Sequence, residues 1–358
     1  MVLPNLALVN FFRKLKDPRS TRRRRHFLLD IIAIAICAVI AGCDDWQQIE
    51  TFGKHRVAWL KQYLQLPNGI PSHDTFERVF ERIDPVAFQG CFRDWVKSVC
   101  DVLGLKHIAI DGKTLCGSRS GKLKALHLVS AWAADNQLTL GQVATDEKSN
   151  EITAIPQLLD LLSIEGAFVT IDAMGCQKDI AAKIVDRGGD YLLTVKENQP
   201  TLYADIQNSF IRAHDTNFAG LDFDEYQTKD KGHGRFETRT YTIIKNPTTL
   251  SQNDLWAELK VIGMCVSHRI VKEKESTDIR FFIGSRDASA KKYGDTLRGH
   301  WGIENALHWQ LDVSFDEDSN RVSNRHGGEN LALVRRGAIS PHREISGKMK
   351  HHRGDVVD

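Results

Sequence analysis

The chain has 358 residues, of which 42% are hydrophobic and 26% charged, and its formal net charge at pH 7 is only +2. This composition excludes a disordered or fibrous protein, and the length allows two domains with a sizeable core. Seven cysteines without a C-x-x-C pair argue against a disulfide framework and a zinc ribbon, and favour a reducing, cytoplasmic setting. With so small a net charge, nucleic-acid binding can be inferred only where basic residues gather on one surface.

Basic residues gather near the N-terminus, where residues 11–26 hold eight Lys or Arg and a single Asp. The apolar run at 27–42 is shorter than the roughly 20 residues that span a bilayer, and it contains Asp30. It therefore predicts a buried helix and no membrane segment. A secretory signal does not fit either, because the arginines begin too far into the chain and no A-x-A-like site follows.

Residues 1–100 are predicted to form an N-terminal helical domain. After the apolar run, an apolar period near 3.6 predicts helices at 46–64, 72–83 and 86–103. Ser72 or Asp74 is the expected N-cap of the middle one. A small helical module flanked by arginines is typical of DNA-binding domains, with a helical packing or oligomerisation module as the alternative. The candidate DNA contacts are Arg22, Arg23, Arg24 and Arg25.

A second domain is predicted at 101–336, where short apolar runs alternate with helical segments. The expected strands are 106–115, 127–135, 139–147, 166–175 and 190–199, and the expected helices are 151–164 and 177–189. Near-continuous Val, Ile and Leu in such strands predict an α/β core whose sheet is covered on both faces.

Residues from about 200 to 290 have a β-rich, hairpin-like pattern, predicted to extend the sheet or form a subdomain. Its expected strands are 235–245, 259–271 and 277–286. A helix containing Glu304 follows. After Arg336 the tail at 337–358 loses its apolar periodicity, which indicates a truncation or a shifted reading frame.

Asp111 and Asp172 each close an apolar strand, and Glu304 lies on a polar helix face. An acid at the end of a buried strand is costly unless it is paired or binds a cation, and ligands bind at this edge of open α/β sheets. A lone Asp often only caps the next turn. Three carboxylates, however, favour Mg²⁺ or Mn²⁺, and such ions can activate the attacking oxygen and stabilise the leaving oxygen at a phosphodiester.

The helix around Glu304 also supports a rival prediction. His300, Glu304 and His308 follow one another at i, i+4 spacing and could bind zinc or iron in a hydrolase, with Asp312 as a fourth ligand. This leaves Asp111 and Asp172 unexplained, and the H-E-x-x-H arrangement is absent. In a third interpretation the apolar side chains of the helix pack on the core and the polar stripe faces solvent.

Six segments, AIDGKTLCGS, ATDEKSNEITAIPQLL, VTIDAMGCQKDIA, YLLTVKENQP, KGHGRFETR and RGHWGIENALHWQLDVSFDEDSNR, resemble in this order the DDE transposases of the H-repeat-associated insertion-sequence family (the ISAs type). The resemblance covers roughly residues 8–336. It implies a ribonuclease H-like catalytic core with a β-rich insertion, preceded by the helical domain. It places the three metal-binding catalytic acids at Asp111, Asp172 and Glu304, with Mg²⁺ or Mn²⁺ as the cofactor.

The reaction that this resemblance implies is cleavage at transposon ends, followed by attack of the freed 3′-hydroxyl on target DNA. The implied partners are double-stranded DNA and a second copy of the chain in a homodimer, with a nucleoid-associated location. The alternative is an inactive remnant that only binds DNA. Related groups carry a Tyr, Arg, Glu, Lys signature around the third acid. Counted from Glu304, its other three positions fall here on Leu297, His300 and Leu311, so the signature is not met literally. Implied neighbours of the acids or DNA contacts are Lys113, Lys148, Asn150, Lys196, Asn198, His233, Arg235, Arg298, His300 and Asn305.

Overall fold

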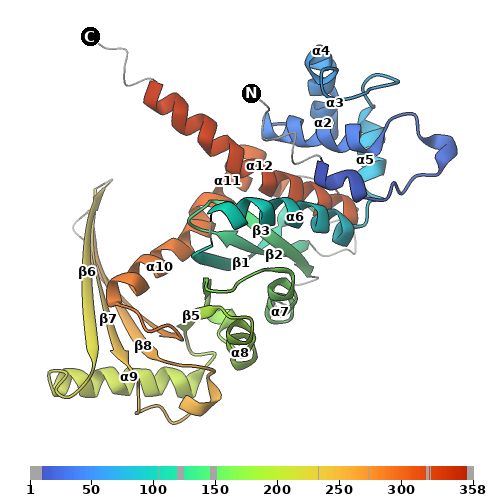
Figure 1. The fold of residues 1–358 in the computed structure, drawn as a ribbon. Helices are drawn as coiled ribbons and strands as arrows, with labels where there is room; N and C mark the ends of the chain where they lie inside the picture. The colour runs from blue at the N-terminus through green and yellow to red at the C-terminus, as the bar shows by residue number, and fades with distance from the viewer. Residues whose placement is uncertain are drawn as a thin grey trace.

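The N-terminal helices pack around one almost completely buried apolar helix. In the computed structural model, which describes residues 10–103, 105–118, 125–145, 151–232, 234–272, 274–319, 322 and 324–352, the helices between residues 28 and 80 lie at one end of the molecule, and the helix at 85–103 lies against the sheet (Figure 1). They are α2 (Leu28–Ile40), α3 (Trp46–His55), α4 (Val57–Leu60), α5 (His73–Phe80) and α6 (Pro85–Leu103), after the short turns η1 (Phe12–Lys14) and η2 (Thr21–Arg23). Helix α2 has ten buried residues, which confirms the buried helix predicted at 27–42. Within the described ranges, every helix is too short or too polar to cross a bilayer.

The predicted helical segments are confirmed, with one subdivision. The segment at 46–64 is divided into α3 and α4, which meet at Arg56. Ser72, and not Asp74, is the N-cap residue of α5. Helix α2 contacts the C-terminal helix α12 (Arg325–His352), so the two ends of the chain share one core.

A nine-stranded sheet forms the centre of the fold. Its strand order is β3-β2-β1-β4-β5-β9-β8-β7-β6. Strands β1, β4 and β5 pair in parallel, and the other neighbours are antiparallel. The strands are β1 (His107–Leu115), β2 (Leu126–Ala133), β3 (Leu138–Thr145), β4 (Phe168–Ile171), β5 (Asp190–Val195), β6 (Phe223–Gly232), β7 (Arg235–Lys245), β8 (Val261–Val271) and β9 (Lys274–Gly284).

Helices cover both faces of the first half of the sheet, as the sequence predicts. Gln142 of β3 donates a hydrogen bond to the backbone of α12, whereas its neighbour Gly141 faces Leu158 of α7 (Glu151–Leu161). Because successive residues of a strand point to opposite faces, α12 and α7 lie on opposite sides of the sheet. Helix α8 (Lys178–Asp186) packs beside α7 and contacts β5.

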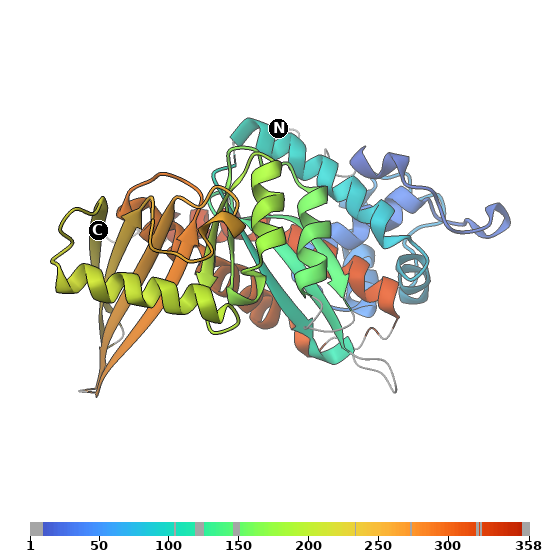
Figure 2. The same ribbon diagram turned by 90° about the horizontal axis from the view of Figure 1, so that it is seen from below.

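The β-rich segment extends the sheet from β5, which is one of the two predicted alternatives. It also contains a helix that the prediction missed. Helix α9 (Pro200–Asp215) crosses one face of the added strands (Figure 2). Its buried residues Leu202, Ile206 and Phe210 recur at helical spacing, a signal that the sequence does carry. Strand β6 carries no such signal because its residues are mostly polar, and it forms by pairing with residues 235–244 of β7.

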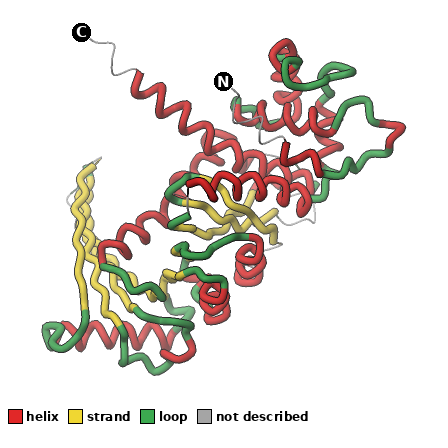
Figure 3. Tube along the Cα trace, viewed as in Figure 1, coloured by secondary structure: helices red, strands yellow, loops and turns green. Residues whose placement is uncertain are grey.

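The segment after the sheet contains one continuous helical run (Figure 3), and the helix type changes in its middle. It consists of α10 (Ala290–Gly302), a π-helical turn η7 (Ile303–His308) and α11 (Trp309–Phe315). The π turn breaks the i, i+4 register predicted for 300–312, because a π-helix has more residues per turn than an α-helix. Helix α12 continues past Arg336 to His352, so the predicted tail boundary is not a break in the backbone structure.

Candidate active site

Two strand aspartates are neighbours across the parallel ladder of β1 and β4. Ile110 pairs with Ile171 at the end of this ladder, so the next position is Asp111 within β1 and Asp172 directly after β4. The prediction that Asp111 ends its strand is wrong, because β1 continues to Leu115 in its pairing with β2. Asp111 does lie at the end of the parallel ladder. The two carboxylates are therefore brought together at the edge where the parallel pairing stops.

Asp172 is held by the turn that follows it. Its Oδ1 accepts hydrogen bonds from the amides of Met174 at 3.0 Å and Gly175 at 3.4 Å, which makes it the N-cap of the short helix η5 (Ala173–Gly175). Asn198 braces this turn by donating to the carbonyl oxygen of Ala173 at 2.7 Å. The cap occupies one carboxylate oxygen. The capping and ligand interpretations of Asp172 are therefore compatible.

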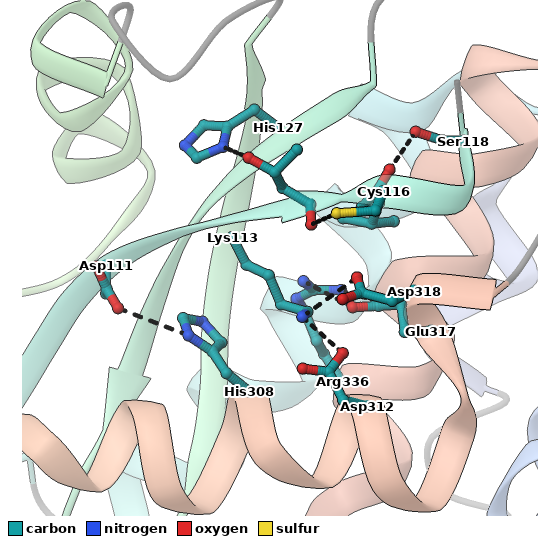
Figure 4. A network of polar contacts seen from close by, with 12 residues as sticks. Asp111, Lys113, Cys116, Ser118, His127, His308, Asp312, Glu317, Asp318 and Arg336 are labelled. Atoms are coloured by element: carbon teal, nitrogen blue, oxygen red, sulfur yellow. Dashed lines mark hydrogen bonds and ion pairs between the residues drawn. The ribbon is translucent and has the colours of Figure 1, made fainter. Parts of the chain in front are cut away.

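Asp111 is a partly buried acid among other acids. The pKa of its carboxyl is raised to about 7, mainly by burial and in addition by the nearby carboxylates of Asp172, Glu304 and Glu151, against a lowering by the Gly112 amide. His308 lies beside it, with Nδ1 3.6 Å from Oδ2 (Figure 4). Burial lowers the pKa of His308 to about 3, so the ring is neutral at pH 7 and brings no full positive charge to Asp111. The local excess of negative charge would be relieved by a cation.

Glu304 lies on the exposed surface of the π turn η7. Together with Asp172 it lines a cavity of about 940 Å³, to which Lys196, Asn198 and His300 also contribute. In the part of the chain that the structure describes, no three His, Cys, Asp or Glu side chains are grouped closely enough to hold a metal ion. Glu304 therefore faces the same cavity as Asp172 without forming a closed ligand set.

The alternative zinc or iron stripe is dispersed by the same π turn. Nδ1 of His300 lies 2.9 Å from the hydroxyl of Thr170, His308 faces Asp111, and Asp312 accepts a hydrogen bond from Lys113. Only Glu304 of this stripe is exposed at the cavity. The predicted single face of four ligands is therefore wrong, because each side chain has different surroundings.

A buried histidine pair ties α10 to the sheet next to the acids. The Thr170 hydroxyl lies 2.8 Å from Nε2 of His107 and 2.9 Å from Nδ1 of His300. Burial lowers the pKa of His107 to about 3 and that of His300 to about 4, so both rings are neutral. These bonds position the start of the segment that carries Glu304.

His107 is expected to make the fold sensitive to acid. Its pKa is depressed in the folded protein, so its contribution is complete above the unfolded pKa of about 6.5 and is lost as pH falls below that value. Between pH 7.5 and 5.5 the loss should be about 1.4 kcal/mol, because only the unfolded chain takes up the proton. Urea unfolding of the wild type and His107→Asn at both pH values measures it. An equal fall in both proteins would contradict the assignment.

Lys113 has a structural environment that the sequence did not indicate. Predicted as a DNA contact, it is 9% exposed and donates to Asp312 at 2.6 Å and to Asp318 at 3.5 Å (Figure 4). Beside it, Arg336 and Glu317 are fully buried and lie 3.0 Å apart. Lys113 therefore joins β1 to α11 and to the short helix η8 (Glu317–Ser319) instead of facing solvent.

A buried His and Glu pair, also missed, lies behind Asp111. Nε2 of His127 is 2.7 Å from Oε1 of Glu151, and its Nδ1 is 2.7 Å from the hydroxyl of Thr114. Gly112 leaves room for this pair, since a Cβ there would lie 2.4 Å from Oε1 of Glu151. The dense polar run EKSNE, which ends in Glu151, was the only sequence signal for it.

The remaining predicted DNA contacts fall into three groups. Lys148, Asn150 and His233, and the side chain of Arg23, lie outside the described residues. Arg22 and Arg25 are exposed near α2, and Arg24 donates to the carbonyl oxygens of Arg19 and Asp17. Lys196 and His300 line the cavity of Asp172 and Glu304, while a second cavity, which Glu304 also lines, contains Arg235, Arg298 and Asn305.

Two protein-family models match successive parts of the chain. The family described as "Transposase DDE domain" matches residues 103–339, and the one described as "DDE_Tnp_1-associated" matches residues 9–96. "Putative transposase YncI" of Escherichia coli O157:H7 is 42% identical over 98% of this chain and 92% of its own length. "H repeat-associated putative transposase YhhI" of E. coli strain K12 is 42% identical over 90% of this chain and 87% of its own length.

Among solved structures, a piggyBac transposase synaptic complex with hairpin DNA aligns with 97% of this chain and 73% of its own chain, at 11% identity and a TM-score of 0.42. Such a score is too low to support an inference. The family assignment rests on the two family matches and on the relatives of similar length. The chain is a member of the DDE transposase family, and its relatives include the H repeat-associated transposases.

Proposed function

We propose that this transposase cleaves and joins DNA at the ends of an insertion sequence, with Asp111, Asp172 and Glu304 holding Mg²⁺ or Mn²⁺ on a ribonuclease H-like core. One observation carries the proposal. The pairing of Ile110 with Ile171 makes Asp111 and Asp172 neighbours at the end of the parallel ladder, and Glu304 faces the cavity that Asp172 lines.

The donor chemistry fits a hard divalent cation. All three groups offer carboxylate oxygens, which Mg²⁺ and Mn²⁺ prefer over nitrogen or sulfur ligands. The raised pKa of Asp111 shows that its negative charge is poorly compensated in the protein alone. Glu304 would complete the ligand set by turning inward from the π turn, and π turns inside helices often lie at functional sites.

The reaction would proceed in two displacements. In the first, a water attacks phosphorus at the element end, and the P–O3′ bond breaks to leave a 3′-hydroxyl and a 5′-phosphate. In the second, this 3′-hydroxyl attacks a target phosphodiester, forming a new P–O bond and releasing a target 3′-hydroxyl. A bound divalent cation would polarise the phosphate and favour deprotonation of the attacking oxygen.

The protein's own residues would place these reactants. The strand β4 and the cap of η5 fix Asp172, while the π turn carries Glu304 into the cavity. Lys196 is exposed on the same cavity and would contact a phosphate. The N-terminal helices, with Arg22 to Arg25, would bind the DNA duplex, and two copies of the chain would hold the two ends together.

Metal dependence of cleavage tests the proposal. Purified protein is incubated with a labelled duplex that carries the end sequence flanking its gene, in Mg²⁺, Mn²⁺, Zn²⁺ or EDTA. We expect nicked product with Mg²⁺ or Mn²⁺ and none in EDTA. Binding without cleavage would support the DNA-binding remnant instead. Cleavage or other hydrolysis that requires stoichiometric zinc, and is lost in His308→Ala, would support the zinc alternative.

A further inference from the structure

Positive charge in strands β7, β8 and β9 is confined to one face of the sheet. Strands β7, β8 and β9 pair without an irregularity, so cross-strand partners share a face and successive residues alternate. All Lys and Arg residues of these strands lie on the same face: Arg235, Arg239, Lys245, Arg269, Lys274 and Arg280. Threonine and apolar side chains predominate on the other face, with His268 and Glu275. We call the first one the arginine face.

Helix α10 and helix α9 cover opposite faces of these strands. Phe282 stacks on Tyr293 of α10, whereas its neighbour Phe281 packs against Phe210 of α9. Phe282 and Arg280 are two residues apart on β9, so α10 lies on the arginine face. Arg298 of α10 joins the strand arginines in lining a cavity of about 470 Å³.

The guanidinium groups in this cavity are held by buried and half-buried carboxylates. Glu237 is 2% exposed and lies 2.6 Å from Arg269 and 2.8 Å from Arg239. Asp230 lies 2.7 Å from Arg298 and also contacts Arg239. Five arginines line the cavity, against the four carboxylates of Glu237, Asp230, Asp278 and Glu304, so the local balance remains positive by one charge. The arginines are therefore fixed in place without being neutralised.

The cavity on the arginine face adjoins the cavity that Asp172 and Glu304 line. Arg280, Trp301 and Glu304 line both cavities, and the guanidinium of Arg280 lies 4.6 Å from the centre of the Trp301 ring. Arg235, at the far end of β7, is four residues from Arg239, or about 13 Å along an extended strand. This span exceeds a single phosphate group, so an extended polyanion fits it better than a small anion.

We propose that the arginine face binds the sugar-phosphate backbone of the DNA strand that leads away from the cleavage site, and that Glu237 is a positioning residue for its arginines. The proposal rests on the proposed function. Arginine suits the role because its planar group donates two parallel hydrogen bonds to a phosphate. Contacts of this kind do not depend on base sequence.

Binding of a labelled 30-base-pair duplex of mixed sequence, in EDTA, tests the arginine face separately from cleavage. Arg235→Gln/Arg280→Gln removes two exposed charges from it, and Lys229→Gln/Lys231→Gln removes two exposed charges from the opposite face of the same sheet. At moderate salt we expect about tenfold weaker binding for the arginine variant. Its plot of log affinity against log salt should be shallower by about 2, one unit per lost phosphate contact.

The possible outcomes separate the two proposals. Equal affinities and salt slopes for the arginine and lysine variants would overturn the arginine face, even if the wild type cleaves DNA. A wild type that binds but does not cleave, with the arginine variant weaker, would uphold the arginine face and contradict the proposed function. A wild type that binds no duplex would overturn both.

Glu237→Gln distinguishes positioning from simple charge. Removing a negative charge from a basic face would by itself strengthen DNA binding. If Glu237 orients Arg239 and Arg269, the variant should instead bind the same duplex several-fold more weakly, while the exposed Glu275→Gln on the opposite face does not. Tighter binding by Glu237→Gln would refute the positioning role. Should that variant fail to fold, the comparison of the two double variants still decides the main proposal.

Discussion

Asp111→Asn and Asp172→Asn are each expected to lower the rate of DNA cleavage by roughly a thousandfold or more, because each removes an anionic ligand. Metal stabilisation of transition-state charge contributes several kcal/mol, and about 4 kcal/mol corresponds to this factor. Glu304→Gln should act in the same direction. Affinity for the duplex in EDTA should stay within about twofold, since phosphate contacts come from basic groups. Single-turnover cleavage and fluorescence anisotropy measure the two effects.

Glu197→Gln is the matched control for these variants. Glu197 is exposed and lines the same cavity as Asp172 and Glu304, but it is not a proposed ligand. Its loss should change the rate by no more than about threefold, as for a charge screened by solvent. A comparable loss in Glu197→Gln would mean that the charge of the cavity matters rather than three specific ligands. Full activity of Asp111→Asn would contradict the proposed site.

The stability of Asp111→Asn shows whether the fold survives the change. The pKa of Asp111 is raised to about 7, so its ionised form destabilises the metal-free protein progressively as pH rises above its unfolded pKa of about 3.9. In EDTA at pH 8 the Asn variant should therefore unfold at a higher temperature than the wild type. A lower unfolding temperature would indicate that lost packing, and not lost metal binding, explains any inactivity.

Glu317→Gln is expected to lower the free energy of unfolding by about 3–5 kcal/mol, the range for breaking a buried ion pair by removing one partner. Both Glu317 and Arg336 are 0% exposed, and two contacts join their charged groups, at 3.0 and 3.4 Å. Without the carboxylate, the guanidinium of Arg336 would keep only neutral partners such as the Ser130 hydroxyl, at 3.3 Å. Urea unfolding at pH 7.5 measures the loss.

Two further variants define the origin of that loss. Glu317→Leu/Arg336→Met removes both charges and should recover much of the stability, because apolar side chains of similar volume can replace a buried pair. Lys183→Gln breaks the half-exposed pair of Lys183 and Asp160 and should lose less than about 1 kcal/mol. A loss of that small size for Glu317→Gln would show that water reaches the pair. Since the pair joins α12 to η8, just after α11, its loss should also loosen the segment that carries Glu304.

Local patterns predicted most of the elements correctly. The apolar run of α2, the alternation in β7 and the helical period of α6 each lie within a single segment, so they can be read without knowledge of the partner. The predicted 235–245 strand has the same bounds as β7. Strand β6 could not be found in this way because its stability comes from pairing with β7, and polar residues such as Lys229 and Asp230 carry no burial signal.

For the candidate site, the residue types alone selected the three acids. Asp111 and Asp172 stood out because a carboxylate beside a run of Ile and Val has a high desolvation cost. That they are neighbours depends on the parallel register of β1 and β4, which joins residues 61 positions apart. No local pattern encodes such a register.

The sequence by itself determined the family and most of the helices and strands, and it supplied the three acids as candidates, because these depend on motifs and periods within short segments. Only the tertiary structure decided the partners of the charged residues. Lys113 binds Asp312 and Asp318, and Glu237 holds Arg239 and Arg269 on one face of the sheet. A charged side chain near Glu304 can contact DNA, a metal ion or another side chain. Which of these it contacts depends on its burial and on partners that are remote in sequence.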